Sequence, residues 1–227
     1  MYLRKIMIEN IVIVPSAIGA RIGVIDIKDR FTQTLEGLKS IRERIPNSYI
    51  IFCDCSLEST GGDAGVILPL VDQYFDFAQH EQVRQFSMYG MKSHGELVMF
   101  VSAIQFALAN IDMSSVDRIF KLGGRGILND QFDIEKYKEA KGKYVFKTPS
   151  DSWMGNGMKI YETRMYSLHK DNIDDYFKKF DNIIGSCEGG FQSEHSHYKC
   201  LDPDMVYPFE TLGLQYVVSS TGQTAYD

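Results

Sequence analysis

The stretch that decides the fold is Ile11-Val12-Ile13-Val14-Pro15. Its unbroken apolar run predicts a strand that is buried on both faces. Apolar residues then recur at helical spacing over residues 31–45, and Pro46 ends that helix. Tyr49–Cys53 is a second apolar run of strand length. A strand, a helix and a strand of these lengths predict a βαβ unit with a right-handed crossover, and therefore an α/β fold.

Small and polar residues follow both strands at the point where each strand ends. Ser16 and Ala17 come directly after the first strand, and Asp54 and Ser56 come after the second. Ligands of such sheets bind at the carboxyl ends of the strands. We therefore expect a nucleotide to lie between these two loops. For Asp54 there is a structural alternative, because a carboxylate at a strand end commonly closes an Asx turn.

A second informative stretch, Arg118–Asp133, joins a short apolar strand to a glycine-rich, charged loop. Gly124 allows the backbone to approach a ligand closely. Lys121 and Arg125 bring two positive charges to the same place, and a guanidinium matches phosphate oxygens in geometry. Asp130 follows within reach of a hydroxyl group or a metal. This combination is typical of a nucleotide-sugar site, and the alternative is a solvated turn after a buried strand.

The segment Lys92-Ser93-His94-Gly95-Glu96 leads into an apolar run that extends to Ala109. The run is apolar on nearly all sides, which predicts a central, buried helix. Free amides at the start of this helix, together with Lys92, would form a pyrophosphate site. The equally weighted alternative is ordinary capping, because Ser93 and Glu96 have the spacing of a capping box. Both can hold.

The remaining periodicity predicts further strands and helices. We expect strands over residues 117–122, 144–147, 158–168 and 215–219, helices over residues 173–184 and from Glu194 to before Pro203, a mobile glycine-rich loop at Ser59–Gly65 and a loop at Gly185–Phe191. Asp171 is the expected cap of the helix that begins at Ile173. With no internal repeat and no interdomain linker, residues 1–227 are expected to form a single domain.

Composition sets limits on location and partners. A chain of 227 residues with 44% hydrophobic content can bury a proper core, and a net charge of −6 argues against a broad surface for polyanions. A local lysine run spans Lys136–Lys147. Cys53 and Cys55 are expected core thiols, and the cysteine spacing matches no zinc pattern. With charges within Met1–Asn10 and no apolar run of membrane length, we expect a cytoplasmic protein.

The loop of Arg118–Asp133 resembles the Lys-x-Ser-Gly-Arg-Tyr-x-Leu-x-Asp-x-Phe signature of small glycosyltransferases of viruses, phages and bacteria. The matching residues are Lys121, Gly124, Arg125, Leu128, Asp130 and Phe132. Gly123 stands where serine is usual and Gly126 where tyrosine is usual. Six more blocks resemble the family in the same order: Arg30–Leu35, Phe52–Ser56, Lys92–Glu96, Glu162–Ser167, Gln192–Ser196 and Leu212–Leu214.

The resemblance implies a GT-A-like, Rossmann-like nucleotide-sugar fold with a mixed, mostly parallel sheet flanked by helices. The implied activity is hexosyl or pentosyl transfer from a UDP- or GDP-sugar to an acceptor hydroxyl, with inversion. Arg30 would belong to the donor site, and Asp54 would hold Mn²⁺ or Mg²⁺ with Ser56 in place of a second acid. Glu194 is the expected general base, and Asp130 competes for that role or binds a sugar hydroxyl.

The acceptor and the chemistry leave alternatives open. A glycan ranks first as acceptor, and hydroxymethylated cytosine in phage-type DNA ranks second, with the lysine run as the rim that would contact phosphates. A rival of another class is a non-catalytic nucleotide- or carbohydrate-binding protein on the same fold. A nucleotidyltransferase is less favoured, because the first strand is not followed by the usual glycine-rich phosphate loop. For a viral member, the expected location is the host cytoplasm.

Overall fold

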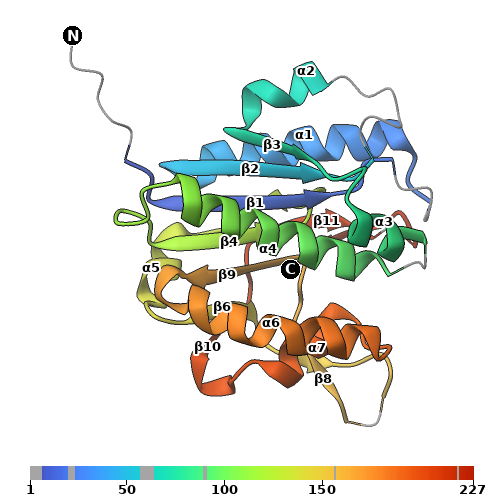
Figure 1. The fold of residues 1–227 in the computed structure, drawn as a ribbon, viewed down its shortest axis with the longest axis vertical. Coiled ribbons are helices and arrows are strands. Elements are labelled where there is room, and N and C mark those ends of the chain that lie inside the picture. Colours follow the sequence, from blue (N-terminus) through green and yellow to red (C-terminus); the bar gives the residue numbers. More distant parts are fainter. Residues whose placement is uncertain (1–6, 20–23, 57–63, 89–90, 156, 219) are drawn as a thin grey trace.

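The computed structural model describes residues 7–19, 24–56, 64–88, 91–155, 157–218 and 220–227. At the centre of this part of the chain is a seven-stranded sheet (Figure 1). Its strands, in spatial order, are β10 (Val206–Phe209), β6 (Tyr144–Lys147), β9 (Met165–His169), β4 (Arg118–Leu122), β1 (Asn10–Ser16), β2 (Ser48–Asp54) and β3 (Gln73–Asp76). The predicted strands at the start of the chain and at residues 117–122 and 144–147 are confirmed.

The sheet is mixed and mostly parallel, as predicted. β1 runs parallel to β2 and β4, β2 to β3, and β10 to β6, whereas β9 is antiparallel to both of its neighbours. The chain builds outward from β1 to β2 and β3, and then returns to place β4 on the other side of β1. This reversal creates a topological switch point, and ligands of open α/β sheets bind beside such a point at the carboxyl ends of the strands.

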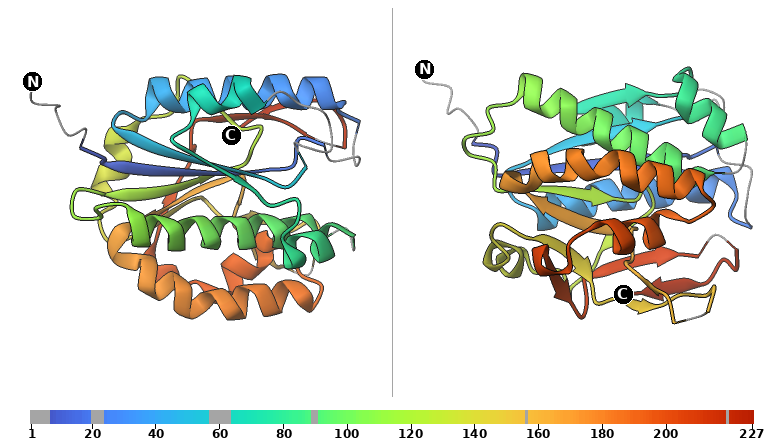
Figure 2. Two further views of the ribbon diagram at one scale, coloured as in Figure 1. Left: turned by 45° about the horizontal axis from the view of Figure 1, so that its top comes forward. Right: turned by 60° about the horizontal axis from the view of Figure 1, so that its bottom comes forward.

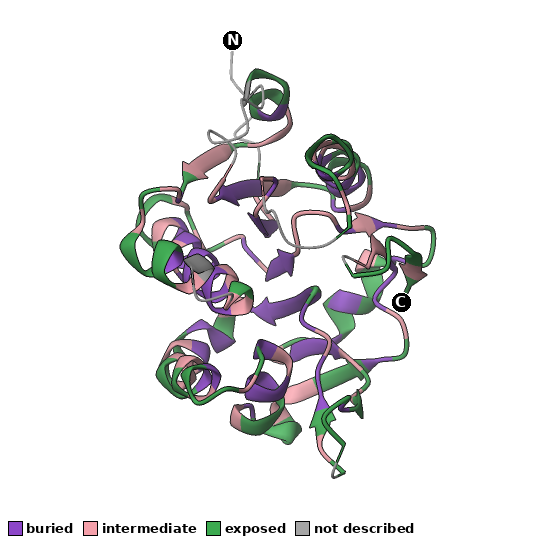
Figure 3. Cartoon of the chain, turned by 90° about the vertical axis from the view of Figure 1, so that its right-hand side faces the viewer, coloured by how far each residue is buried: buried purple, intermediate pink, exposed green. Residues whose placement is uncertain are grey.

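Helices cover both faces of the sheet (Figures 1 and 2). The helices are α1 (Ile27–Arg44), α2 (Ala64–Ile67), α3 (Glu81–Met88), α4 (Lys92–Asn110), α5 (Ile134–Glu139), α6 (Ile173–Glu188) and α7 (Ser193–Cys200). Alternate residues of β1 enter two separate cores. Val12 and Val14 pack in the core that includes α1, and Ile11 and Ile13 pack in the core that includes α4 and α6. Figure 3 shows the buried strands between helices whose outer sides are exposed.

Two small sheets complete the described structure. One is antiparallel, in the order β12 (Thr224–Tyr226), β11 (Leu214–Val217) and β5 (Ile127–Leu128), and the other pairs β7 (Ser150–Asp151) with β8 (Lys159–Ile160). Because β5 follows β4 directly, β11 ties the end of the chain to the loop after β4. None of the described helices is long and apolar enough to cross a membrane.

Several boundaries differ from the prediction for local reasons. The single strand expected over residues 158–168 is wrong, because β8 and β9 are separated by residues 161–164, which leave the sheet. The expected loop at Gly185–Phe191 begins later, since α6 continues to Glu188 and buries Cys187. Asp171 does not cap α6, because the 3-10 turn η3 (Lys170–Asn172) precedes it and Asn172 is the cap. Most of the loop predicted at Ser59–Gly65 lies outside the described residues.

The cysteines at the end of β2 and just after it, Cys53 and Cys55, behave as predicted. Cys53 is fully buried, and both Cys53 and Cys55 pack in the core on the α4 side of the sheet. Burial raises the pKa of the Cys53 thiol, so the thiol stays protonated. All four cysteines are free.

Arg118 is a buried cation in β4 that stabilises a helix end. Its guanidinium donates to the carbonyls of Tyr137 and Ala140, both at 3.0 Å, and to the carbonyl of Lys143 at 2.8 Å. Its Nε donates to the Ser167 hydroxyl at 3.0 Å. Burial lowers the Arg118 pKa to about 10, which still leaves the side chain charged at neutral pH. The side chain therefore supplies the donors that the carboxyl end of α5 lacks.

Candidate functional site

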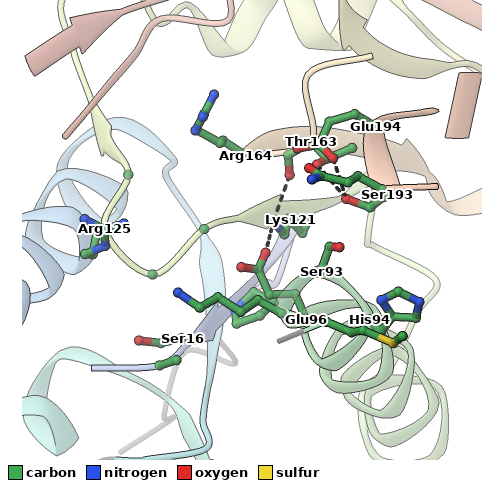
Figure 4. A pocket seen from close by; sticks show the side chains of 18 of the residues that line it. Ser16, Ser93, His94, Glu96, Lys121, Arg125, Thr163, Arg164, Ser193 and Glu194 are labelled. Carbon is green, nitrogen blue, oxygen red and sulfur yellow. Dashed lines mark hydrogen bonds and ion pairs between the residues drawn. The ribbon is translucent and has the colours of Figure 1, made fainter. Parts of the chain in front are cut away.

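A cavity of about 560 Å³ opens at the carboxyl ends of β1 and β4, beside the switch point (Figure 4). Its wall is built from segments that lie far apart in sequence. They are the end of β1, the start of α1, the start of α4, the loop after β4, the irregular segment before β9, the end of α6 with the residues that follow it, the start of α7 and strand β11. The fold therefore gathers these short segments around one volume.

Glycines close the loop after β4 onto the end of β1. The Gly124 amide donates to the Pro15 carbonyl at 2.9 Å. A Cβ on Gly124 would lie 2.6 Å from the Cβ of Ser16, so only glycine fits at this position. A Cβ on Gly126 would lie 2.8 Å from Leu122 Cδ1 and 2.9 Å from Leu214 Cδ1. The tyrosine usual in the resembling family has no room at Gly126, because packed leucines fill that space.

The start of α4 contributes Lys92, Ser93, His94 and Glu96 to the wall. The predicted capping box is wrong: α4 begins at Lys92, and its cap, Met91, makes no side-chain hydrogen bond. Glu96 instead forms an ion pair with Lys121 at 2.8 Å. Lys121 also donates to the Thr163 carbonyl at 2.8 Å, and its side chain is 4% exposed. This pair links α4 to β4, and the Glu96 side chain remains 43% exposed.

Basic side chains dominate the wall of the cavity. Among the described residues, the basic side chains that line it are Arg30, Lys92, Lys121, Arg125 and Arg164. Burial, and then the nearby charge of Arg30, lower the Arg125 pKa to about 10. Burial, followed by the charges of Arg30 and Arg125, also lowers the Lys92 pKa. Mutual repulsion of this kind means that the cations converge on one volume, where an anion would relieve it.

Glu194 lies on the opposite wall, at the start of α7 (Figure 4). The Ser193 hydroxyl donates to the Glu194 carboxylate at 3.1 Å, and the Thr163 hydroxyl lies 3.1 Å from Ser193 Oγ. The Tyr161 amide donates to the Glu194 carbonyl at 3.3 Å. Hydrogen bonds therefore hold both the backbone and the side chain of Glu194. A carboxylate so placed can accept a proton from a hydroxyl bound in the cavity.

A buried chain of hydrogen bonds supports α7 from behind. His197 Nδ1 lies 2.7 Å from the Ser193 carbonyl, His197 Nε2 lies 3.1 Å from the Tyr176 hydroxyl, and that hydroxyl lies 3.1 Å from the hydroxyl of Tyr166. Burial lowers the His197 pKa to about 4. His197 is therefore neutral near pH 7 and positions the helix that presents Glu194.

The shifted pKa of His197 predicts a pH-dependent stability. The unfolded chain restores the ordinary pKa, so it binds more protons than the folded protein below about pH 6.5, and acid favours unfolding. The free energy of unfolding should fall by about 2 kcal/mol between about pH 7 and pH 5 through this group. Urea unfolding of the protein and of His197→Gln at both pH values measures it. Equal falls in the two proteins would contradict the assignment.

The structure places the predicted residues in two groups. Lining the cavity are Ser16, Ala17, Arg30, Lys92, Lys121, Gly124, Arg125 and Glu194. Asp54, Ser56 and Asp130 do not line it. His195, the residue after Glu194, is also outside the cavity and is hydrogen-bonded to Ser152.

Asp54 is fully buried and ties the loops after β1 and β2 together. One carboxylate oxygen accepts from the Ile18 amide at 3.0 Å, and the other accepts from the Ser56 amide at 2.7 Å and from the Ser56 hydroxyl at 3.2 Å. The bond from the Ser56 amide is that of an Asx turn. In the part of the chain that the structure describes, no three His, Cys, Asp or Glu residues are grouped to hold a metal. Because both oxygens of Asp54 accept hydrogen bonds from backbone amides and Asp54 does not line the cavity, its carboxylate as placed offers no ligand for Mn²⁺ or Mg²⁺ there.

Asp130 lies at the other end of the sheet. Its exposed carboxylate pairs with Arg44 at the carboxyl end of α1, whereas the cavity lies near the start of that helix. The lysine run that begins at Lys136 starts in α5, at the same far end (Figure 1). Neither feature borders the cavity.

Some wall residues were not singled out from the sequence. Glu96, Thr163, Arg164 and Ser193 all lie in blocks that resemble the glycosyltransferase family, but none of the four was predicted to bind the donor or to act in catalysis. Tyr216 is a further example: the Arg164 guanidinium lies 4.1 Å from the centre of its ring. The first four residues could have been found from the family-like block that contains each of them. Tyr216 could not, because only the pairing of β11 with β5 brings it to the cavity.

No protein-family model matches the chain, and no curated protein has a matching sequence. Solved structures of similar shape include a glycosyltransferase involved in glycosylation of the major capsid of PBCV-1, with a TM-score of 0.48, 10% identity and coverage of 89% of this chain and 84% of that one. Core-mannan synthase A from Aspergillus fumigatus, in a Mn/GDP form, gives a TM-score of 0.48, 9% identity and coverage of 90% and 73%. A cytidylyltransferase from Leptospira borgpetersenii gives a TM-score of 0.47 at 9% identity, with coverage of 89% of this chain and 77% of that one.

Proposed function

We propose that this protein is a nucleotide-sugar-dependent glycosyltransferase. The observation that supports this most directly is the composition of one cavity at the switch point. Lys92 and Arg125, from distant segments, lie on its wall together with the carboxylate of Glu194. Cations suit the diphosphate of a donor, and a carboxylate suits the proton of an acceptor. The ordered resemblance to small glycosyltransferases gives the same function from the sequence.

The donor in this proposal is a UDP- or GDP-sugar. Its diphosphate would lie against Lys92 and Arg125, near the ends of β1 and β4, where Gly124 leaves the backbone open to close approach. Negative charge grows on the diphosphate as its bond to the sugar breaks. Fixed guanidinium and ammonium groups stabilise that charge without reorganising. Arg30 and Lys121 would add to the same positive field.

The reaction in this proposal is a single displacement with inversion, by which a hexosyl or pentosyl residue is transferred. The acceptor hydroxyl oxygen forms a bond to the anomeric carbon, the bond from that carbon to the diphosphate oxygen breaks, and the hydroxyl proton passes to Glu194. Glu96 is the other carboxylate among the described residues that line the cavity. Its ion pair with Lys121 neutralises it, so we assign the base to Glu194.

A glycan is the acceptor that we favour. An enzyme acting on duplex DNA needs, besides the basic side chains inside its cavity, a basic outer rim that holds the phosphates of the duplex. The lysine run begins in α5, at the end of the sheet opposite the cavity. That position supports a glycan over hydroxymethylated cytosine.

Donor binding and hydrolysis test the proposal. Thermal shifts and product release are measured with UDP- and GDP-sugars in EDTA and in Mn²⁺, and we expect a response to at least one donor. Lys92→Ala should weaken that donor's binding about tenfold or more, because a charge-assisted hydrogen bond is lost. Lys39→Ala, an exposed position on α1, is the matched control and should bind normally.

The outcomes of this experiment are distinct. No response to any donor would refute the proposed function. Binding without hydrolysis or transfer would favour a non-catalytic binding protein, and release of pyrophosphate from a nucleoside triphosphate would favour a nucleotidyltransferase. A response that requires Mn²⁺ would show that the donor binds together with a metal ion.

A further inference from the structure

A tryptophan is displayed beside the proposed acceptor side of the cavity. Trp153, the single tryptophan of the chain, lies in the turn between β7 and β8 and is 59% exposed. The next residue, Met154, is 48% exposed. Large apolar side chains grouped on a surface mark a site of binding more often than scattered ones do.

The turn that presents Trp153 is held by its own hydrogen bonds. The Ser152 amide donates to the Met158 carbonyl at 2.8 Å, and the Gly155 amide donates to the Ser152 carbonyl at 3.1 Å. The Met154 amide donates to Ser152 Oγ at 3.0 Å. Gly155 has a φ of 72°, a conformation that glycine adopts without strain. These bonds fix the backbone on either side of Trp153, whose side chain is exposed.

An aromatic cluster connects Trp153 to the cavity. The Trp153 ring meets His195 edge to face, with centroids 5.0 Å apart and planes at 78°. His195 is 4% exposed and is held by Ser152, whose Oγ lies 2.6 Å from His195 Nε2. On another side His195 contacts Phe191, at a centroid distance of 6.0 Å, and Phe191 lines the cavity. Glu194, on the same helix as His195, lines the cavity as well.

We infer that Trp153 is a subsite for a sugar ring of the acceptor glycan. This inference rests on the proposed function, because it takes Glu194 as the acceptor-side carboxylate. A pyranose ring has an apolar face of C–H groups and a polar edge of hydroxyls. The flat ring of Trp153 matches the apolar face of the sugar. The exposed side chains of Asp151 and Gln192 offer hydrogen-bond partners for the hydroxyls at its edge. The ring that receives the new bond would then lie near Glu194, with the next ring of the chain on Trp153.

The test uses the natural fluorescence of this one tryptophan. The protein, saturated with UDP or GDP, is titrated with cellotriose, chitotriose, mannotriose and galactotriose, and separately with a duplex containing hydroxymethylcytosine. At least one trisaccharide should change the Trp153 emission in a saturable way. Calorimetry should then show binding at least tenfold weaker for Trp153→Ala, partly recovered in Trp153→Tyr. Leu108→Ala, an exposed apolar residue at the end of α4 remote from the cavity, is the control and should bind as the unaltered protein does.

Each result has a defined meaning. If no trisaccharide changes the emission, or if Trp153→Ala binds the sugar as well as Leu108→Ala does, the inference is wrong. A response to the modified duplex alone would also overturn it and would make DNA the acceptor. Binding of the nucleotide is recorded in the same samples, so loss of the proposed function itself would be seen separately, as failure of UDP and GDP to bind.

Discussion

Replacing Glu194 by Gln is expected to lower the rate of sugar transfer about a hundredfold or more, as expected for loss of a general base. Glutamine keeps the size of the side chain and can still accept the hydrogen bond from the Ser193 hydroxyl, so the start of α7 should remain in place. The amide cannot take the proton of the acceptor hydroxyl. Steady-state rates with the donor identified by thermal shift, together with the donor dissociation constant, measure the effect. The dissociation constant should be unchanged.

Two matched variants make this result specific. Glu188→Gln removes an exposed carboxylate at the end of α6 and should leave the rate unchanged. Glu96→Gln removes the other described carboxylate of the cavity and breaks its ion pair with Lys121. If Glu96→Gln abolishes turnover while Glu194→Gln retains it, the base is Glu96 and our assignment is wrong.

Replacing Arg118 by Met is expected to destabilise the protein by about 3 kcal/mol or more, because three carbonyls around the end of α5 lose the hydrogen bonds of a buried, charged donor. The affected carbonyls are those of Tyr137, Ala140 and Lys143. A loss of this size should lower the melting temperature by about 6–12 °C in a chain of this length. Urea unfolding and a thermal melt measure both quantities.

An exposed arginine gives the control for this second change. Arg84→Met, on the solvent side of α3, removes the same charge from the surface and should change stability by less than about 0.5 kcal/mol. A loss in Arg118→Met no greater than that of Arg84→Met would show that the buried hydrogen bonds contribute little.

A strand could be predicted from the sequence where its residues form an unbroken apolar run. β1, β2, β4 and β6 are buried along most of their length, and their sequences show it. β3 and α3 were not predicted, since β3 is short and only partly buried. Residues 161–164 alternate as a strand does but lie outside the sheet, because the Gly123 amide donates to the Arg164 carbonyl and the Tyr161 amide to Glu194. Tertiary hydrogen bonds of this kind have no periodic signal.

The wall of the cavity was predictable to the extent that family-like blocks pointed to it. Lys92, Arg125 and Glu194 were named from such blocks, and all three line the cavity. Asp54 and Asp130 were chosen because carboxylates at a strand end or in a charged loop suit a metal or a sugar. Sequence does not reveal which way a loop carboxylate turns. Asp54 turns inward to two backbone amides, and Asp130 turns outward to Arg44.

The pairing of β11 with β5 has a consequence for how the chain acquires its site. Arg125 donates to the Val217 carbonyl at 3.3 Å, a contact between residues 92 positions apart. Contacts of such long range form slowly, because the loop between them must close first. During synthesis the strands of the central sheet leave the ribosome before β11 does. Until β11 follows, the wall of the cavity lacks the residues that β11 contributes. A ligand that binds only the folded site stabilises only the folded protein. A nucleotide sugar would therefore stabilise the chain only after β11 has paired with β5 and completed the cavity wall.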